Sequence, residues 1–296
     1  MPTRFDHAVI GVSDLDAALE RFRRLGFDAQ PGGRHADGET HNGLIRFGLD
    51  YVELLAVYDE EVATARGRTL LDALDGREAA LLGYALATAT IEEEATRFRG
   101  TDATPQQPRA MGRQRLGGQA LTWRVLTPGG TSWRRPWPFL IQWDTPDDER
   151  LKIDLPGTHA NGAIGWKRVA VAVHDLESAR EIYRNQLGLE QVKEEAGSAR
   201  SARRATFVIG EGSIDVLSPE GEGQGLQVLA EHSEGPYALS FTVKDLEQTR
   251  AFLQAHQIGF VDETAGGGKL LLAPDETLGV HLSFVRESKK QEEQDR

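Results

Sequence analysis

The pattern of apolar and polar positions repeats along the chain. Segments 5–27, 165–189 and 237–260 each begin with an apolar run, pass through a polar turn and end in an amphipathic stretch. Segment 81–98 is a less regular copy. In the copy that begins at 165, valines alternate with alanines over 169–173, which is the period of a strand. Apolar residues then recur at spacings of three and four, which marks one face of a helix: Leu176, Ala179, Tyr183 and Leu187.

Further apolar runs of strand length follow each predicted helix. These strands are expected near 27–31, 43–48, 51–57, 119–127, 138–144, 204–209, 213–217, 259–263, 269–273 and 279–285. Segment 101–118 is rich in Pro, Gln, Arg and Gly and is expected to be a long loop, whereas an additional helix is expected at about 60–79. The repeat therefore predicts an α+β fold built from four tandem β-α-β-β-β modules.

One stretch near the middle of the chain, 146–164, carries no copy of the repeat. A length of 296 residues also fits two domains of about 150 residues each. We therefore expect a first domain at 1–146, a linker at 147–164 and a second domain at 165–287, each domain holding two modules. The polar tail at 288–296 is expected to be disordered.

Composition excludes several classes of function. The formal net charge of −12 argues against binding to nucleic acid or to an anionic membrane surface. The chain has no cysteine, which excludes disulfides and thiolate sites and fits the cytoplasm. No signal-peptide core, and no apolar run of about 20 residues as a membrane span requires, is present. No phosphate loop or dinucleotide fingerprint occurs, so no nucleotide cofactor is expected.

A polar residue interrupts the apolar run of the last predicted strand in every module. These residues are Glu53, Gln142, Asp215 and His281. Because burying an unpaired carboxylate is costly, each of them must face water, a partner or a ligand. A solvated sheet face and a ligand site both satisfy that requirement.

Tryptophans are concentrated in one segment, since three of the five fall within 133–143. Trp143 and Trp137 are candidate walls of a pocket for an apolar or aromatic ligand, with Arg134 or Arg135 near its mouth. Packing of these rings against the 62–79 helix or a partner subunit is an equal alternative.

The repeat resembles the vicinal oxygen chelate superfamily, which includes glyoxalase I, bleomycin-resistance proteins and extradiol dioxygenases. The segments that carry the resemblance are DHAVIGVSDLDAALERFRRLGF and VAVAVHDLESAREIYRNQLGL, with VELLAV and IDVLSP as closing strands. HNGLIRFGLDYVELLAV and PWPFLIQWD are similar more narrowly to a glyoxalase-like domain family. The resemblance implies that paired modules curl into cups and that metal ligands come from the first and last strand of each module.

For the first half, the resemblance implies a metal site made by His7, Glu53 and Gln142. The counterpart of His7 on the first strand of the second module is about Gly83, or else Tyr84, and Gly83 offers no ligand. His41 or His35 could complete the set. Imidazole, carboxylate and amide ligands suit Zn²⁺, Mn²⁺, Fe²⁺ or Ni²⁺. Glu53 is also the candidate catalytic residue, because a carboxylate there could move a proton.

The second half differs from the first. Arg168 and Ala238 take the position of His7, and neither can hold a metal. Arg168 is a candidate ligand-binding residue for a carboxylate, but an ion pair with Asp215 is the favoured interpretation.

Two functions remain open. The first is a metal-dependent lyase, isomerase or dioxygenase that acts on a small oxygen-rich substrate in the N-terminal cup. The alternative is a metal-free binding or resistance-type protein, in which Trp143, Trp137 and Arg168 matter most; a purely structural role comes third. The sequence leaves the oligomeric state open, including a homodimer in which modules pair between chains.

Overall fold

The computed structural model describes residues 1–35, 38–61, 63–101, 103–114, 120–130, 133–195, 202–220, 229–230, 233–263 and 268–287. The expected disordered tail at 288–296 lies outside them. Elements of the first half are β1 (Arg4–Val12), α1 (Leu15–Arg24), β2 (Ala29–Arg34), β3 (Thr40–Arg46), β4 (Tyr51–Val57), α2 (Ala65–Leu74), β5 (Ala79–Ala87), α3 (Ile91–Arg97), β6 (Arg109–Gln114), β7 (Ala120–Leu126) and β8 (Phe139–Trp143).

Helix α4 (Asp147–Ile153) follows, within the stretch expected to be a linker. Elements of the second half are β9 (Ala163–Ala172), α5 (Leu176–Glu181), the π-helical turn η1 (Ile182–Gln186), β10 (Glu190–Glu195), β11 (Ala202–Ile209), β12 (Gly212–Pro219), β13 (Gly235–Val243), α7 (Leu246–Ala255), β14 (Phe260–Asp262), β15 (Lys269–Leu272), the 3₁₀ turn η3 (Pro274–Glu276) and β16 (His281–Arg286). The exact domain boundaries stay a prediction.

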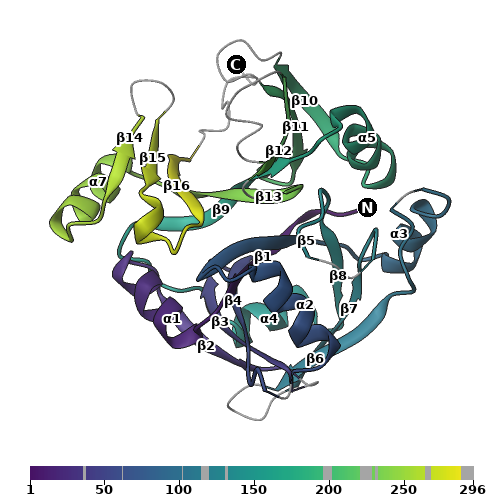
Figure 1. Ribbon diagram of the computed structural model, residues 1–296, viewed down its shortest axis with the longest axis horizontal. Coiled ribbons are helices and arrows are strands. Elements are labelled where there is room, and N and C mark those ends of the chain that lie inside the picture. The colour runs from purple at the N-terminus through teal and green to yellow at the C-terminus, as the bar shows by residue number, and fades with distance from the viewer. Residues whose placement is uncertain are drawn as a thin grey trace.

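The strands form two curled eight-stranded sheets, one in each half (Figure 1). Their orders are β2-β3-β4-β1-β5-β8-β7-β6 and β10-β11-β12-β9-β13-β16-β15-β14. The first strands of paired modules lie antiparallel at the centre of each sheet, β1 beside β5 and β9 beside β13. The prediction of an α+β fold with four modules is therefore confirmed, and modules pair within one chain and within each half.

The repeated dipeptide Asp-Leu explains why three of the four modules turn from strand to helix at the same place. Asp14, Asp175 and Asp245 are extended N-cap residues whose carboxylates accept hydrogen bonds from backbone N–H groups of the following turn. Such caps are typically worth about 1 kcal/mol each. The repeat in the sequence is thus largely a repeat of helix-start chemistry.

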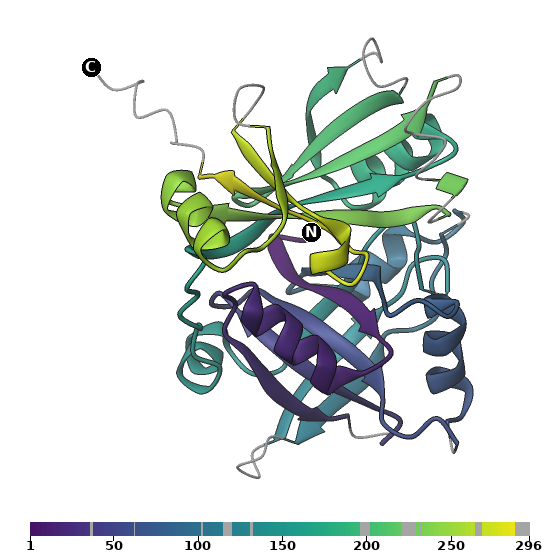
Figure 2. The same ribbon diagram turned by 60° about the vertical axis from the view of Figure 1, so that its left-hand side comes forward.

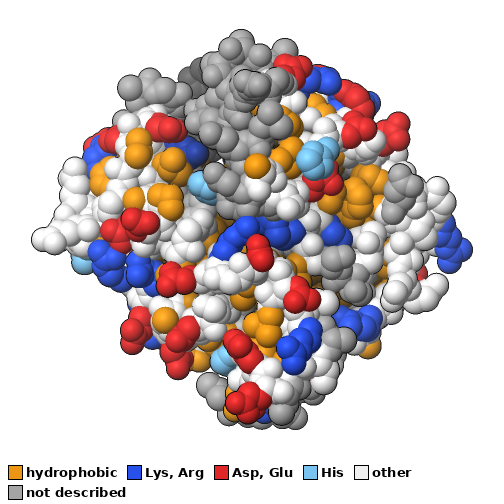
Figure 3. All heavy atoms as spheres, in the orientation of Figure 1, with side chains coloured by type: hydrophobic (Ala, Val, Ile, Leu, Met, Phe, Trp, Pro, Cys, Tyr) orange, Lys and Arg blue, Asp and Glu red, His pale blue; other side chains and the backbone are white. Residues whose placement is uncertain are grey.

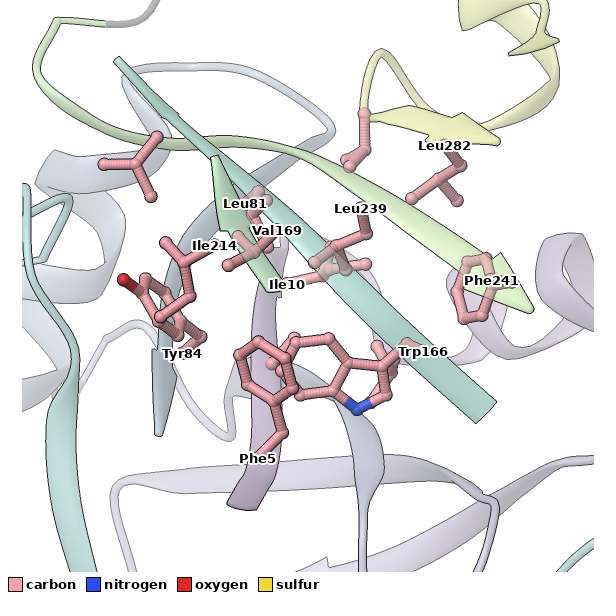
Figure 4. Close-up of a cluster of buried hydrophobic side chains, with 14 of the residues drawn as sticks. Phe5, Ile10, Leu81, Tyr84, Trp166, Val169, Ile214, Leu239, Phe241 and Leu282 are labelled. Carbon is pink, nitrogen blue, oxygen red and sulfur yellow. The ribbon is translucent and has the colours of Figure 1, made fainter. Parts of the chain in front are cut away.

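The two sheets pack back to back and share one apolar core (Figure 2). Figure 4 shows Phe5, Ile10 and Tyr84 of the first half against Trp166 and Val169 of the second. The Phe5 and Trp166 ring centroids are 4.5 Å apart. Burial of each such side chain contributes about 1.5–3 kcal/mol, so this core joins the halves.

Strand β1 contributes side chains both to this core and to the opposite face of the sheet. A register shift between Phe5 and His7 breaks the strict alternation of the strand. Phe5 and Ile10 therefore point into the shared core, whereas His7 and Val9 point to the concave face. Without the shift, Phe5 and His7 would lie on the same face.

Helix α2 contacts β1, β4 and β5 on the concave side of the first sheet. Its Leu70 and Leu74 pack in the cluster that contains Val9 and Leu55. On the face shown in Figure 3, Lys and Arg side chains gather across the middle of the molecule, where the halves meet. Among the described residues, no helix is long and apolar enough to span a membrane.

Candidate functional site

A pocket of about 260 Å³ opens on the concave face of the first sheet. Strands β1, β4, β7 and β8 supply much of its lining, with additions from α2, β6 and the loop before β8. The lining residues are His7, Val9, His35, Asn42, Tyr51, Glu53, Leu55, Thr69, Arg109, Met111, Trp123, Val125, Thr127, Trp133, Arg135, Phe139 and Trp143. We call this space the N-terminal cup.

Two imidazoles approach the same carboxylate at one side of the cup. The Nε2 atom of His7 lies 3.9 Å from one oxygen of Glu53, and the Nε2 atom of His35 lies 3.6 Å from the other. All three side chains are less than 10% exposed. His7 and Glu53 come from the adjacent parallel strands β1 and β4, which are the first and last strands of the first module. Their roles in metal binding and catalysis stay predictions.

Hydrogen bonds to residues outside this trio orient the side chains of His7, His35 and Glu53. The Nδ1 atom of His7 lies 2.8 Å from an Asp6 carboxylate oxygen, and Nδ1 of His35 lies 2.8 Å from the Thr40 hydroxyl. Asn42 donates through Nδ2 to Glu53 at 2.5 Å. Because a carboxylate only accepts, Nδ1 of His7 donates to Asp6. In the neutral form of the imidazole, Nε2 then presents its lone pair to the cup.

Asp6 anchors this arrangement from a fully buried position. Its second oxygen accepts from the indole N–H of Trp143 at 2.9 Å and lies 3.3 Å from Arg4 and 3.6 Å from Arg150. Burial alone would raise the pKa of the Asp6 carboxyl. The hydrogen bond from His7 and the charges of His7, Arg150 and Arg4 outweigh that effect, and the pKa lies below its usual value. Asp6 is therefore ionised at neutral pH.

Aromatic rings form the walls of the cup. Trp123 and Trp143 have centroids 4.9 Å apart, and Trp133 and Phe139 line the same space. Trp143 thus lies where a ligand-binding residue was expected. Trp137 does not line the cup: its indole donates to the Pro128 carbonyl at 2.9 Å, and its ring packs against the shared core. We therefore remove Trp137 from the candidate ligand-binding residues.

Gln142 lies on the opposite sheet face from His7 and Glu53. Its amide oxygen accepts the Ile91 backbone N–H at 3.0 Å and so caps the start of α3. Strand register explains the misplacement. Glu53 on β4 pairs with Val9, two positions after His7 on β1. In the second module Ala85, two positions after Gly83, pairs with Phe139 on β8, so Phe139 is the counterpart of Glu53. The expectation that Gln142 completes a metal site does not agree with this geometry.

The same register applies in the second half. Asp215 pairs with Ala170, two positions after Arg168, and is the counterpart of Glu53. Ser283 rather than His281 takes that place in the last module. Arg168 lies 3.7 Å from Asp215 through Nε, which is the ion pair that the sequence favoured. Its role as a ligand-binding residue therefore loses support.

Of the two histidines offered to complete the site, His35 lies in the cup. His41 instead stacks edge to face against Tyr58, with ring centroids 5.3 Å apart. No pattern in the sequence singled out Asn42, Tyr51 or Arg109 for the lining. Within the described ranges, no group of three or more His, Asp or Glu side chains is arranged to hold a metal ion.

Comparisons with known proteins agree with this architecture. The model of the family described as "Glyoxalase-like domain" matches residues 5–187, and that of the "Glyoxalase/Bleomycin resistance protein/Dioxygenase superfamily" matches residues 167–270. The resemblance to the vicinal oxygen chelate superfamily is thus confirmed. No curated protein matches the chain.

Two solved structures share the fold along nearly the whole chain. A hypothetical protein from Staphylococcus aureus is 14% identical, with a TM-score of 0.64 over 96% of this chain and 99% of that one. A mutant of 4-hydroxymandelate synthase from Streptomyces coelicolor is 13% identical, with a TM-score of 0.67 over 97% and 93%. Methylmalonyl-CoA epimerase from Mycobacterium tuberculosis is 26% identical over 43% of this chain and 90% of its own, with a TM-score of 0.39.

Proposed function

This chain belongs to the glyoxalase-like domain family, and from that premise we propose that it is an enzyme acting in the N-terminal cup. The substrate is a small oxygen-rich molecule, and the reaction is a proton transfer of the isomerase or lyase type. Glu53 moves the proton, and His7 and His35 flank it. The observation that carries this proposal is the approach of two imidazole Nε2 atoms to opposite oxygens of one nearly buried carboxylate.

The chemistry of this group suits removal of a proton from a carbon beside a carbonyl. One Glu53 oxygen accepts from Asn42, and the other, on the side of His7, would take the proton. An N–H donor on the neighbouring His35 imidazole would stabilise the negative charge that develops on the substrate oxygen. Return of the proton from Glu53 to carbon completes an isomerisation. His7, His35 and Glu53 are each less than 10% exposed, so they are poorly accessible to water.

A divalent cation fits the donor types present. The Nε2 lone pair of His7 faces Glu53 while Nδ1 is bonded to Asp6, the arrangement usual for metal-binding histidines. The buried amide oxygen of Asn42 also lacks a hydrogen-bond partner among the described residues. Since no three charged or imidazole ligands are already grouped there, His7 and Glu53 would hold the ion with water or substrate as further ligands. When bound, the ion would polarise a substrate oxygen as a Lewis acid.

The test is exchange of carbon-bound hydrogen in D₂O. A panel of small keto and hydroxy acids is incubated with the protein, and loss of proton signals is followed by NMR. We expect Glu53→Gln to abolish exchange, whereas Asp215→Asn, the matched change in the second half, leaves it intact. Equal exchange by wild type and Glu53→Gln would contradict the proposal.

Metal content is measured separately on untagged protein by mass spectrometry. We expect a bound divalent ion in wild type that is lost in His7→Ala and in Glu53→Ala. Exchange without bound metal would retain the proton-transfer function and remove the cation from it.

The second candidate function is ligand binding without chemistry. The aromatic walls favour it, because Trp123, Trp133, Trp143 and Phe139 suit an apolar ligand whatever happens at Glu53. Tight binding of a panel compound with no exchange would select this alternative.

A further inference from the structure

We infer that the ligand of the N-terminal cup is a small aromatic carboxylic acid, with its carboxylate on Arg135 and its ring against the aromatic walls. This deepens the proposed function by naming the substrate class, and it rests on that proposal only for the site.

The first observation is the balance of charge in the lining. The cup contains one carboxylate, Glu53, and two guanidinium groups, Arg109 and Arg135. The chain as a whole carries a formal net charge of −12. A pocket with excess positive charge in an acidic protein selects anions and repels cations.

The second observation concerns the surroundings of Arg135. Its guanidinium is partly buried and donates through Nη1 to the Gly130 carbonyl. No carboxylate of the described residues lies within 4.0 Å of it. Burial lowers the pKa of Arg135 to about 10, so the group is charged at neutral pH although poorly solvated. A charge in that state gains from an anionic partner, and a carboxylate matches its two-pronged geometry.

The third observation is that the backbone on both sides of Arg135 is fixed. The Arg134 backbone N–H donates to the Leu82 carbonyl at 2.7 Å, and the Pro136 carbonyl accepts from the Tyr183 hydroxyl at 2.7 Å. Tyr183 belongs to the second half and is itself 2.5 Å from the buried Tyr84 hydroxyl. The guanidinium is thus held ready, and a ligand does not have to order this segment.

The fourth observation identifies the body of the ligand. Flat aromatic walls are provided by Trp123, Trp133, Trp143 and Phe139. The Trp143 indole N–H is already bonded to Asp6, and Arg150 covers that ring at 3.8 Å. This wall therefore offers apolar surface rather than a hydrogen bond, which suits an aromatic ring. A volume of about 260 Å³ lies just below the usual range for ligand pockets, roughly 300–1,000 Å³, and limits the ligand to a small molecule.

The experiment uses three matched probes: phenylacetate, phenylacetamide and acetate. Binding to the full chain is followed by tryptophan fluorescence and isothermal titration calorimetry. We expect phenylacetate to bind at least about tenfold more tightly than either of the others, because only it offers both ring and charge. Equal binding of phenylacetate and phenylacetamide, or no binding of phenylacetate, would overturn the inference.

Substitutions then test whether Arg135 is the residue that binds the ligand carboxylate. Arg135→Gln is expected to weaken phenylacetate by about tenfold or more and to leave phenylacetamide unchanged. Arg135→Lys retains the charge without the fork and gives an intermediate loss, which keeps the test open if the glutamine variant folds poorly. Arg168→Gln, in the second half, is the matched control and leaves both probes unchanged. Unchanged phenylacetate affinity in Arg135→Gln contradicts the assignment.

The two proposals fail separately. Glu53→Gln should abolish hydrogen exchange and still bind phenylacetate with preference over phenylacetamide. If wild type shows no preference for phenylacetate over phenylacetamide, only the assignment of the ligand class is overturned. Absence of exchange, with the preference intact, would overturn only the enzymatic proposal.

Discussion

Replacing Asp6 with asparagine tests how the cup is held together. Asp6 is fully buried and faces His7, Trp143, Arg4 and Arg150. Removing one partner of a buried ion pair typically costs about 3–5 kcal/mol, since the other charge stays buried. Arg150 is 3% exposed but still has Asp147 at 3.6 Å and the Trp143 ring. We therefore expect Asp6→Asn to lower the free energy of unfolding by about 3 kcal/mol, the lower end of that range.

Urea unfolding at neutral pH measures this effect. The control is Asp147→Asn, whose carboxylate is 54% exposed and whose loss should change stability by no more than about 0.5 kcal/mol. Adding Arg150→Met to Asp6→Asn should recover part of the loss, because the buried charge is then gone. A loss below about 1 kcal/mol in Asp6→Asn would refute the view that an ionised Asp6 organises this region.

The pH dependence of stability tests separately whether the charge of Asp6 is what stabilises the fold. The pKa of Asp6 is lowered in the folded protein, so its contribution is complete above its unfolded value, about 3.9, and is lost as pH falls through the folded value. The stability difference between wild type and Asp6→Asn should therefore be constant near neutral pH and shrink below about pH 4. A difference that does not shrink in acid would mean that shape, not charge, is its source.

Three further substitutions test the join between the halves by urea or thermal unfolding. Phe5→Ala should cost about 3–5 kcal/mol, since the ring is buried against Trp166; a loss under about 1 kcal/mol would contradict a shared core. Tyr183→Phe should cost about 1–3 kcal/mol by leaving the Pro136 carbonyl unpaired, and should also weaken phenylacetate; unchanged stability and binding would refute this role. Gly26→Ala should cost more than about 1 kcal/mol, because φ is +86° and a Cβ would lie 2.8 Å from the Asn161 backbone nitrogen; a neutral result would show that the turn relaxes.

The sequence predicted the architecture well because local chemistry is repeated. Asp14, Asp175 and Asp245 each cap a helix directly after a strand, and three copies of one signal are hard to misread. The helix caps do not indicate which two modules join to form one sheet. That choice depends on the long-range pairing of β1 with β5 and of β9 with β13.

The candidate site was predicted less well, for reasons of register. FLIQW is apolar on both sheet faces, so its alternation does not reveal that Trp143 rather than Gln142 faces the cup. His35 meets Glu53 at the end of a hairpin whose pairing shifts between Pro31 and Gly33, and no local pattern encodes that shift. Arg135 reaches the pocket from an irregular segment fixed by Tyr183, which lies 48 positions further along the chain.

The back-to-back core has a consequence for genetic screens of this protein. Trp166, Phe241 and Phe284 of the second half belong to the same apolar cluster as Phe5 and Ile10 of the first half. A substitution that destabilises the second half should therefore also lower the stability of the first. Loss-of-function alleles should then be recovered throughout both halves, including positions far from any ligand. A map of sensitive positions would outline the core rather than the catalytic groups. Only activity per folded molecule, compared between alleles, would separate residues of the cup from residues that keep the chain folded.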